Sequence, residues 1–190
     1  KDDPDMISDV MRFLDNVLSD FINKAPEQFK DAIYSAERER SVGLGVMGFH
    51  SFLQKHRIPL ESVMAKSWNK KIFKQIDEQV NQASKDLAEE RGACPDAAEY
   101  GFKERFSNKT AIAPTASISI ICGGASPGVE PIAANSYTHK TLSGSFNVRN
   151  RYLEEILESH GKNDDETWST ITTNQGSVSH LDFLTDLEKD

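Results

Sequence analysis

The sequence predicts a mixed α/β fold, with long helices in the first half and short buried strands after residue 110. Apolar residues recur at three- to four-residue spacing within residues 6–22 and again within residues 62–91, which is the period of an amphipathic helix. The residue pattern changes at Thr110, where short apolar runs begin to alternate with glycine, proline and serine. With 190 residues, the chain fits one domain or a large part of one.

The first helix is expected to begin after Pro4 and Asp5, which are typical of helix starts, and to end before Pro26. Its apolar stripe is typical of a helix that faces a core. The fourth helix is expected to end at Gly92, since glycine favours the left-handed conformation that terminates helices. The helices expected after the first cover residues 27–40, 42–56 and 62–91.

Three glycines, Gly43, Gly45 and Gly48, reproduce the spacing of a dinucleotide-binding loop. That loop needs a hydrophobic strand before it, and the charged residues 38–40 stand there instead. We therefore interpret these glycines as sites of close helix packing.

The second half of the chain is expected to hold the strands. Residues 111–113 and 117–121 look like strand or buried-loop material, interrupted by Pro114, and one or two short strands are expected between residues 137 and 148. A glycine-rich turn is expected between the two regions. The helices expected last cover residues 151–159, a stretch that begins near residue 163, and a stretch that begins at residue 181.

Charge and composition narrow the function classes. The net charge is −8, from 22 basic and 30 acidic residues, which argues against a nucleic-acid partner. No apolar run has the length of a membrane span and no signal sequence is visible, so no membrane partner and a cytoplasmic location are expected. Two cysteines and five scattered histidines do not have the spacing of a metal site.

Residues 114–119, Pro-Thr-Ala-Ser-Ile-Ser, form the candidate ligand-binding stretch of the sequence. Thr115 and Ser117 offer hydroxyl groups, and the small Ala116 leaves room for a ligand near the backbone. Consecutive N–H groups directed at one point form a nest for an anion such as a phosphate. A Ser/Thr-rich turn that leads into a strand explains the same residues without a ligand.

Five ordered motifs decide between these two interpretations, because together they resemble the large subunit of ribonucleotide reductase, in its class I, two-subunit form. The resemblance is best over residues 38–157 and implies that residues 1–190 form part of one catalytic barrel domain, with no second domain. The motifs are Ser41–Phe49, Glu90–Pro95, Ala113–Ser119, Ser126–Pro131 and Lys140–Gly144.

The family fold is a ten-stranded α/β barrel, and the resemblance places this chain in the second half of that barrel. The full subunit would reduce ribonucleoside diphosphates to 2′-deoxyribonucleoside diphosphates. The resemblance assigns Thr115, Ala116, Ser117 and Ile118 to the loop that binds the substrate's phosphates.

No catalytic residue is expected in this chain. The family's radical-forming cysteine lies in an Asn-x-Cys-x-Glu sequence, which this chain lacks, and neither Cys94 nor Cys122 stands in a matching context. The family's adjacent tyrosines, its redox-active cysteine pair and its ATP-binding allosteric regions have no counterpart here either.

The resemblance also implies partners. The chain itself is expected to bind no cofactor or metal. The rest of the large subunit, a small subunit with a di-metal/tyrosyl radical centre, and thioredoxin or glutaredoxin would complete the reaction. Two alternatives stay open: a segment of a cobalamin-dependent ribonucleotide reductase, and a non-catalytic interaction module of reductase ancestry.

The 190-residue chain alone should therefore show no reductase turnover with any reductant. Turnover should appear only when a piece that carries the Asn-x-Cys-x-Glu cysteine and a radical source are added, because this chain lacks the group that starts the reaction. An assay of deoxynucleotide formation by the purified chain checks this, and turnover there would show that the chain is catalytically complete.

Overall fold

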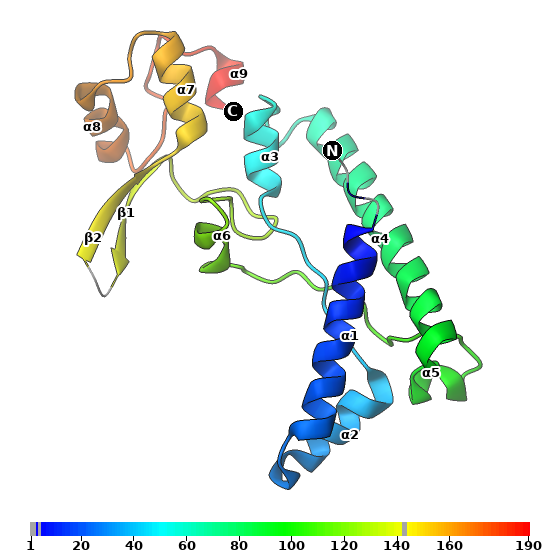
Figure 1. The fold of residues 1–190 in the computed structure, drawn as a ribbon. Coiled ribbons are helices and arrows are strands. Elements are labelled where there is room, and N and C mark those ends of the chain that lie inside the picture. The colour runs from blue at the N-terminus through cyan, green and yellow to red at the C-terminus, as the bar shows by residue number, and fades with distance from the viewer. Residues whose placement is uncertain (1–2, 4, 142–143) are drawn as a thin grey trace. The chain divides into compact units, whose positions relative to one another are not determined.

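The computed structural model describes residues 3, 5–141 and 144–190 (Figure 1). Helices dominate, and the described strands form one antiparallel hairpin. The helices are α1 (Met6–Lys24), η1 (Glu27–Phe29), α2 (Lys30–Glu39), α3 (Phe49–Lys55), α4 (Val63–Arg91), α5 (Pro95–Glu99), α6 (Ile118–Ile121), α7 (Arg151–Ser159), α8 (Asp165–Thr173) and α9 (Asp186–Lys189). The strands are β1 (Ser136–Thr141) and β2 (Gly144–Arg149).

The chain folds into two compact units, each built from two stretches of sequence. The first unit combines Lys1–Val46 with Ser67–Ala113, and the second combines Met47–Lys66 with Pro114–Asp190. The long helices α1 and α4 were predicted from their periodicity, and both are confirmed.

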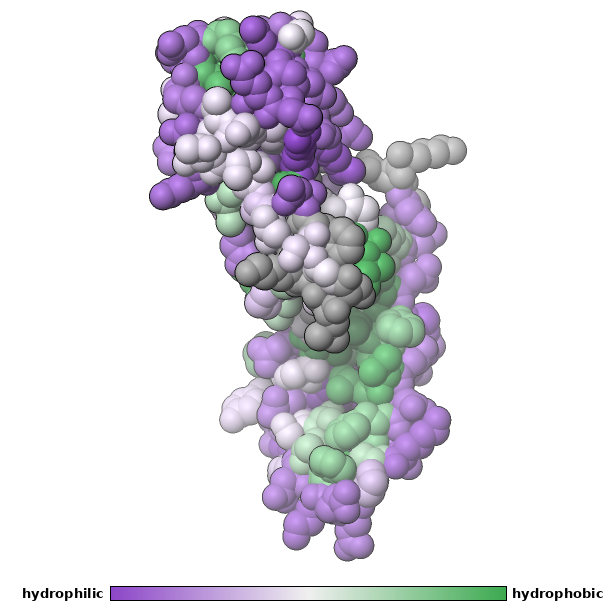
Figure 2. All heavy atoms as spheres, turned by 90° about the vertical axis from the view of Figure 1, so that its left-hand side faces the viewer, coloured by the Kyte–Doolittle hydropathy of each residue, from purple (hydrophilic) through white to green (hydrophobic). Residues whose placement is uncertain are grey.

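The core of the first unit lies between α1 and α4. Ile7 and Met11 of α1 pack against buried residues of α4 and against Phe106, which is 1% exposed. A second apolar stripe of α1 faces solvent, and Figure 2 shows hydrophobic residues gathered at the level that α1 and α2 occupy in Figure 1. The exposed residues of that stripe are Met6, Val10, Phe13, Val17 and Phe21.

Two extended segments pair in parallel beside this core. The Val42 N–H donates to the Asn108 carbonyl at 2.9 Å, and Leu44 bridges Thr110. The expected helix over residues 42–56 is therefore wrong in its first part, since α3 begins only at Phe49. Gly43 and Gly45 do mark close packing, but between extended backbones, whereas Gly48 has a φ of 82° and is the N-cap of α3. A Cβ atom on Gly45 would lie 2.5 Å from the Ala111 carbonyl oxygen.

A buried carboxylate, Asp15, joins the parts of the first unit. It is fully buried on α1 and receives hydrogen bonds from three guanidinium groups. Arg40 Nη2 lies 2.6 Å from Oδ1, Arg91 Nη1 lies 2.8 Å from Oδ2, and Arg105 Nε lies 2.9 Å from Oδ1. Burial by itself raises the pKa of Asp15, but the hydrogen bonds from the three arginines outweigh it and lower the pKa below 3.8.

The second unit has a core of its own, formed by α7, α8 and the turns that follow them. Leu157 and Ile171 are fully buried there, and Trp168 is 2% exposed. The hairpin pairs Tyr137 with Val148 and Ser136 with Arg149. The remaining members of the core are Leu153, Val178, Leu181 and Leu184.

The short strands expected between residues 137 and 148 are confirmed as the hairpin of β1 and β2. Residues 117–121 were expected as strand or buried loop, but residues 118–121 form the short helix α6 and Ser117 is its N-cap. The carbonyls of Thr115 and Ser117 accept the N–H groups of Ser119 and Ile121 there. The strands were expected to be buried, but Tyr137 of β1 is 44% exposed. Of the motif at 140–144, residues 142 and 143 lie outside the described residues, as does Pro4.

Replacing Asp15 with alanine should lower the free energy of unfolding by about 3–5 kcal/mol, because three partly buried guanidiniums would lose their counter-charge. Asp20→Ala on the same helix is the matched control, since its partner Lys24 and Asp20 itself are both mostly exposed. Urea denaturation checks this. Because the folded pKa of Asp15 is depressed, its contribution is present above pH 3.8 and is lost as pH falls through the folded value. Equal losses for the two variants would contradict the central role of Asp15.

Candidate phosphate-binding site

The predicted phosphate loop has an accessible surface and an unusual backbone. Thr115 has a φ of 52°, in the left-handed region that a β-branched residue rarely adopts. The turn at Ala116 and Ser117 then leads into α6 at Ile118. Thr115 is half-buried, whereas Ala116, Ser117 and Ile118 are exposed, so the structure leaves all four within reach of a ligand.

Three successive backbone donors are free for an anion. The N–H groups of Ala116, Ser117 and Ile118 donate no hydrogen bond to any residue within the described ranges. Ser119, by contrast, is used internally: it is 3% exposed, its N–H donates to the Thr115 carbonyl, and its Oγ donates to the Ala116 carbonyl. Unpaired N–H groups at the start of a helix attract anions.

A strap formed by residues 125–132 holds this loop. The Gly128 N–H donates to Thr115 Oγ1 at 2.7 Å, and the Ala125 N–H donates to the Ser119 carbonyl at 3.1 Å. Since Thr115 Oγ1 acts as an acceptor in the first of these bonds, its own hydrogen remains available for a phosphate oxygen.

The first turn of α3 holds the other side of the strap. The Gly48 N–H donates to the Ser126 carbonyl at 2.8 Å, and the Ile132 N–H donates to His50 Nδ1 at 3.3 Å. Ser51 and Ser126 exchange hydrogen bonds: the Ser126 N–H donates to Ser51 Oγ at 2.8 Å, and the Ser51 N–H donates to Ser126 Oγ at 3.1 Å. His50 and Ser51 were not predicted as site residues, because no local sequence pattern marks them and they lie far from the loop along the chain.

His50 must be neutral to accept the Ile132 N–H at Nδ1. Its burial lowers its pKa below the ordinary value of 6.5, which favours that neutral form. The hydrogen on the ring is then assigned to Nε2 by the hydrogen-bond pattern.

A cation, Arg151, stands at the far end of the loop region. Its Nη1 donates to the Gly123 carbonyl at 3.3 Å, and its guanidinium lies 4.9 Å from the centre of the Tyr152 ring. It therefore fixes the glycine turn after α6 rather than the donors before it.

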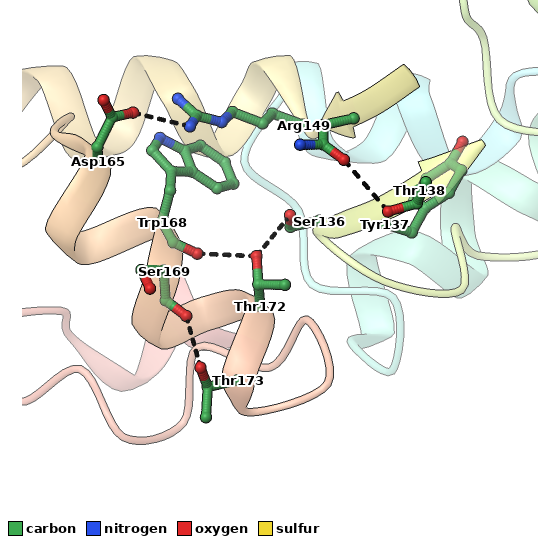
Figure 3. Close-up of a pocket in the computed structure, with 10 residues that line it drawn as sticks. Ser136, Tyr137, Thr138, Arg149, Asp165, Trp168, Ser169, Thr172 and Thr173 are labelled. Atoms are coloured by element: carbon green, nitrogen blue, oxygen red, sulfur yellow. Dashed lines mark hydrogen bonds and ion pairs between the residues drawn. The ribbon is translucent and has the colours of Figure 1, made fainter. Parts of the chain in front are cut away.

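Two cavities lie elsewhere in the second unit. The smaller, of about 300 Å³, is shown in Figure 3. Its polar side chains are largely paired with one another: Arg149 with Asp165, Thr172 with Ser136, and Thr138 with Asn147. The larger, of about 780 Å³, is bordered by α3, α7 and α9, and Gln54 Oε1 there lacks a hydrogen-bond partner among the described residues. Neither cavity includes the predicted loop.

The two cysteines differ in their surroundings. Cys94 is fully buried before α5, Cys122 is exposed after α6, and both are free thiols. Within the described ranges, no three His, Cys, Asp or Glu residues are grouped to hold a metal ion. In the same part of the chain, no helix combines the length and the apolar character needed to cross a bilayer.

Comparison with known proteins decides the family. The description "Ribonucleotide reductase, barrel domain" matches residues 3–104 and 96–190, which together cover nearly the whole chain. The chain belongs to the ribonucleotide reductase barrel-domain family. The α/β fold class and the family predicted from the five motifs are thereby confirmed.

Relatives of this reductase segment agree in name. It is 45% identical over 184 residues to the ribonucleoside-diphosphate reductase large subunit of Invertebrate iridescent virus 3, covering 95% of this chain and 29% of that protein. It is 46% identical to the same subunit of Invertebrate iridescent virus 6, covering 100% of this chain and 20% of the relative. The reductase segment thus spans a fifth to a third of the length of these relatives.

A solved structure supports the fold. The Actinobacillus ureae class Id ribonucleotide reductase alpha subunit superimposes on this segment with a TM-score of 0.86 and 38% sequence identity. The superposition covers 96% of this chain and 33% of that subunit.

Stability should fall as pH drops below 6.5, the ordinary value for histidine, because His50 is neutral in the fold and charges on unfolding. Because the pKa of His50 is lower in the folded than in the unfolded chain, its contribution to stability is fully present above the unfolded pKa. That contribution is lost as pH falls through the folded pKa. His50→Asn keeps an acceptor at the position of Nδ1 but cannot titrate, so its unfolding midpoint should depend less on pH over about pH 5–7.5. Thermal unfolding at several pH values checks this, and an unchanged pH dependence in His50→Asn would contradict it.

Proposed function

We propose that this segment holds the phosphates of a ribonucleoside diphosphate within the large subunit of a two-subunit ribonucleotide reductase. The full subunit would convert the substrate to its 2′-deoxy form. Thr115, Ala116, Ser117 and Ile118 would bind the diphosphate through their N–H groups and the two hydroxyls.

The observation that carries this proposal is a set of three N–H groups, from Ala116 to Ile118, that have no partner among the described residues and lie beside two accessible hydroxyls. The chain carries a net charge of −8, so its overall field repels a diphosphate. Successive N–H groups of a turn can still bind the anion locally, because hydrogen bonds act at short range.

In this proposal the segment acts by positioning. Fixing the diphosphate places the ribose relative to the radical-forming cysteine, which the rest of the subunit would supply. Misplacing a reacting group by about 1 Å can cost roughly a hundredfold in rate. Neither Cys94, which is fully buried, nor Cys122 is assigned a role in the chemistry.

The remaining partners follow from the same proposal. A small subunit with a di-metal/tyrosyl centre would generate the radical, and thioredoxin or glutaredoxin would restore the reduced state. The cofactor would thus belong to the small subunit, and the reductase segment would bind none itself.

One observation favours a second candidate, the cobalamin-dependent reductase. The segment is 41% identical over 139 residues to the vitamin B12-dependent ribonucleoside-diphosphate reductase of Thermoplasma acidophilum. That match covers 70% of this chain, whereas the viral large subunits match 95–100% at higher identity, so we favour the two-subunit form. A pair of adjacent tyrosines in the parent gene would support the two-subunit form.

In the full-length subunit, Thr115→Val combined with Ser117→Ala should weaken nucleoside-diphosphate binding. Each lost hydrogen bond from a hydroxyl to the charged phosphates should reduce the binding free energy by roughly 1.5–3 kcal/mol. The valine also leaves the Gly128 N–H without its acceptor. Isothermal titration calorimetry measures the effect.

The matched control makes the same two chemical changes on α8, where Thr173 Oγ1 donates to the Ser169 carbonyl. Thr173→Val combined with Ser169→Ala should leave substrate affinity nearly unchanged. If the loop variant binds substrate as tightly as the wild type, residues 115–118 are not the phosphate site, although the family assignment would stand.

A further inference from the structure

We propose that Ser51 and Ser126 are positioning residues for the substrate diphosphate, acting through the strap that holds the phosphate loop. This inference rests on the proposed function of residues 115–118. Neither serine belongs to the loop itself, and neither is required to touch the substrate.

The two serines form a closed pair of hydrogen bonds. Each side chain accepts the backbone N–H of the other residue, at 2.8 and 3.1 Å. Ser126 is fully buried and Ser51 is 7% exposed, so water cannot replace a lost partner without local opening. Leaving a buried donor unpaired costs more than the net stabilisation of one hydrogen bond, which makes the pair a fixed point of the backbone.

Two hydrogen bonds link the strap near Ser126 to the loop region. Ala125, next to Ser126, donates its N–H to the Ser119 carbonyl, and Gly128, two residues on, donates its N–H to Thr115 Oγ1. The strap therefore reaches both the start of the loop and the helix that follows it.

The conformation of Thr115 explains why such support matters. A β-branched residue at a φ of 52° is strained, and strained residues persist only when their surroundings fix them. The Gly128 N–H on Thr115 Oγ1 is the contact that orients the side chain. Moving the strap would release Thr115 and scatter the three N–H donors that follow it.

The experiment uses the full-length subunit with Ser51→Ala and Ser126→Ala, made separately. The probes are a nucleoside diphosphate and the matching nucleoside without phosphates, each titrated by calorimetry. Both variants should raise the Kd for the diphosphate by about tenfold and leave the Kd for the nucleoside within about twofold, because only the phosphates meet the displaced loop.

Ser84→Ala is the matched control for loss of a buried serine. Ser84 is fully buried in the first unit, and its Oγ accepts the N–H groups of Arg105 and Phe106. It should cost similar stability without selective loss of diphosphate affinity. Ser51→Thr keeps the hydroxyl and should restore the affinity that Ser51→Ala loses.

Three outcomes would overturn the inference: diphosphate affinity that falls no further than in Ser84→Ala, equal losses for nucleoside and diphosphate, or failure of Ser51→Thr to restore affinity. If Ser126→Ala does not fold, the comparison of Ser51→Ala with Ser51→Thr tests the positioning role by itself. The loop variant separates the two proposals: if Thr115→Val with Ser117→Ala weakens binding but the serine variants do not, only the positioning role fails.

Discussion

The carboxylate of Asp15 is the constraint on which the first unit depends. Taking this charge out of water is costly, and three guanidiniums compensate for it only because they converge from separate parts of the chain. Arg40 ends α2 directly before the extended segment at 42–45, and Arg105 precedes its parallel partner at 107–111. The carboxylate therefore anchors the beginnings of both extended segments, which continue along the chain into α3 and into the proposed phosphate loop.

The sequence was sufficient to predict the elements that follow a simple period. The apolar spacing of α1 and α4 reflects one buried face, which is visible without knowing the neighbour. The extended segment at 42–45 was mistaken for helix because its glycines are required by close packing against Ala111, a residue far along the chain. The isoleucines at 118, 120 and 121 suggested a strand, yet Thr115 and Ser117 already accept helical hydrogen bonds there.

The candidate site divides in the same way. The loop residues were predicted because their motif, together with four others in the same order, resembles the family, and their exposure in the structure is compatible with the proposed role. Ser51 and His50 were not predicted, and Ser126 was noted only as the start of a family motif, since a serine or a histidine that accepts a backbone N–H has no local sequence pattern. The buried role of Asp15 was not predicted for a related reason. The arginines that surround it lie up to 90 positions away, and each alone resembles an ordinary surface residue.

The left-handed Thr115 has an evolutionary consequence. Glycine or asparagine would adopt its backbone conformation at lower cost, so selection for stability alone would remove the threonine. Glycine would remove the hydroxyl, and asparagine would replace it with a planar amide that cannot both accept from Gly128 and donate through one atom. If Thr115 binds phosphate as proposed, a lineage that retains threonine here accepts a less stable fold in exchange for that hydroxyl, as expected where stability and activity make opposite demands on one residue.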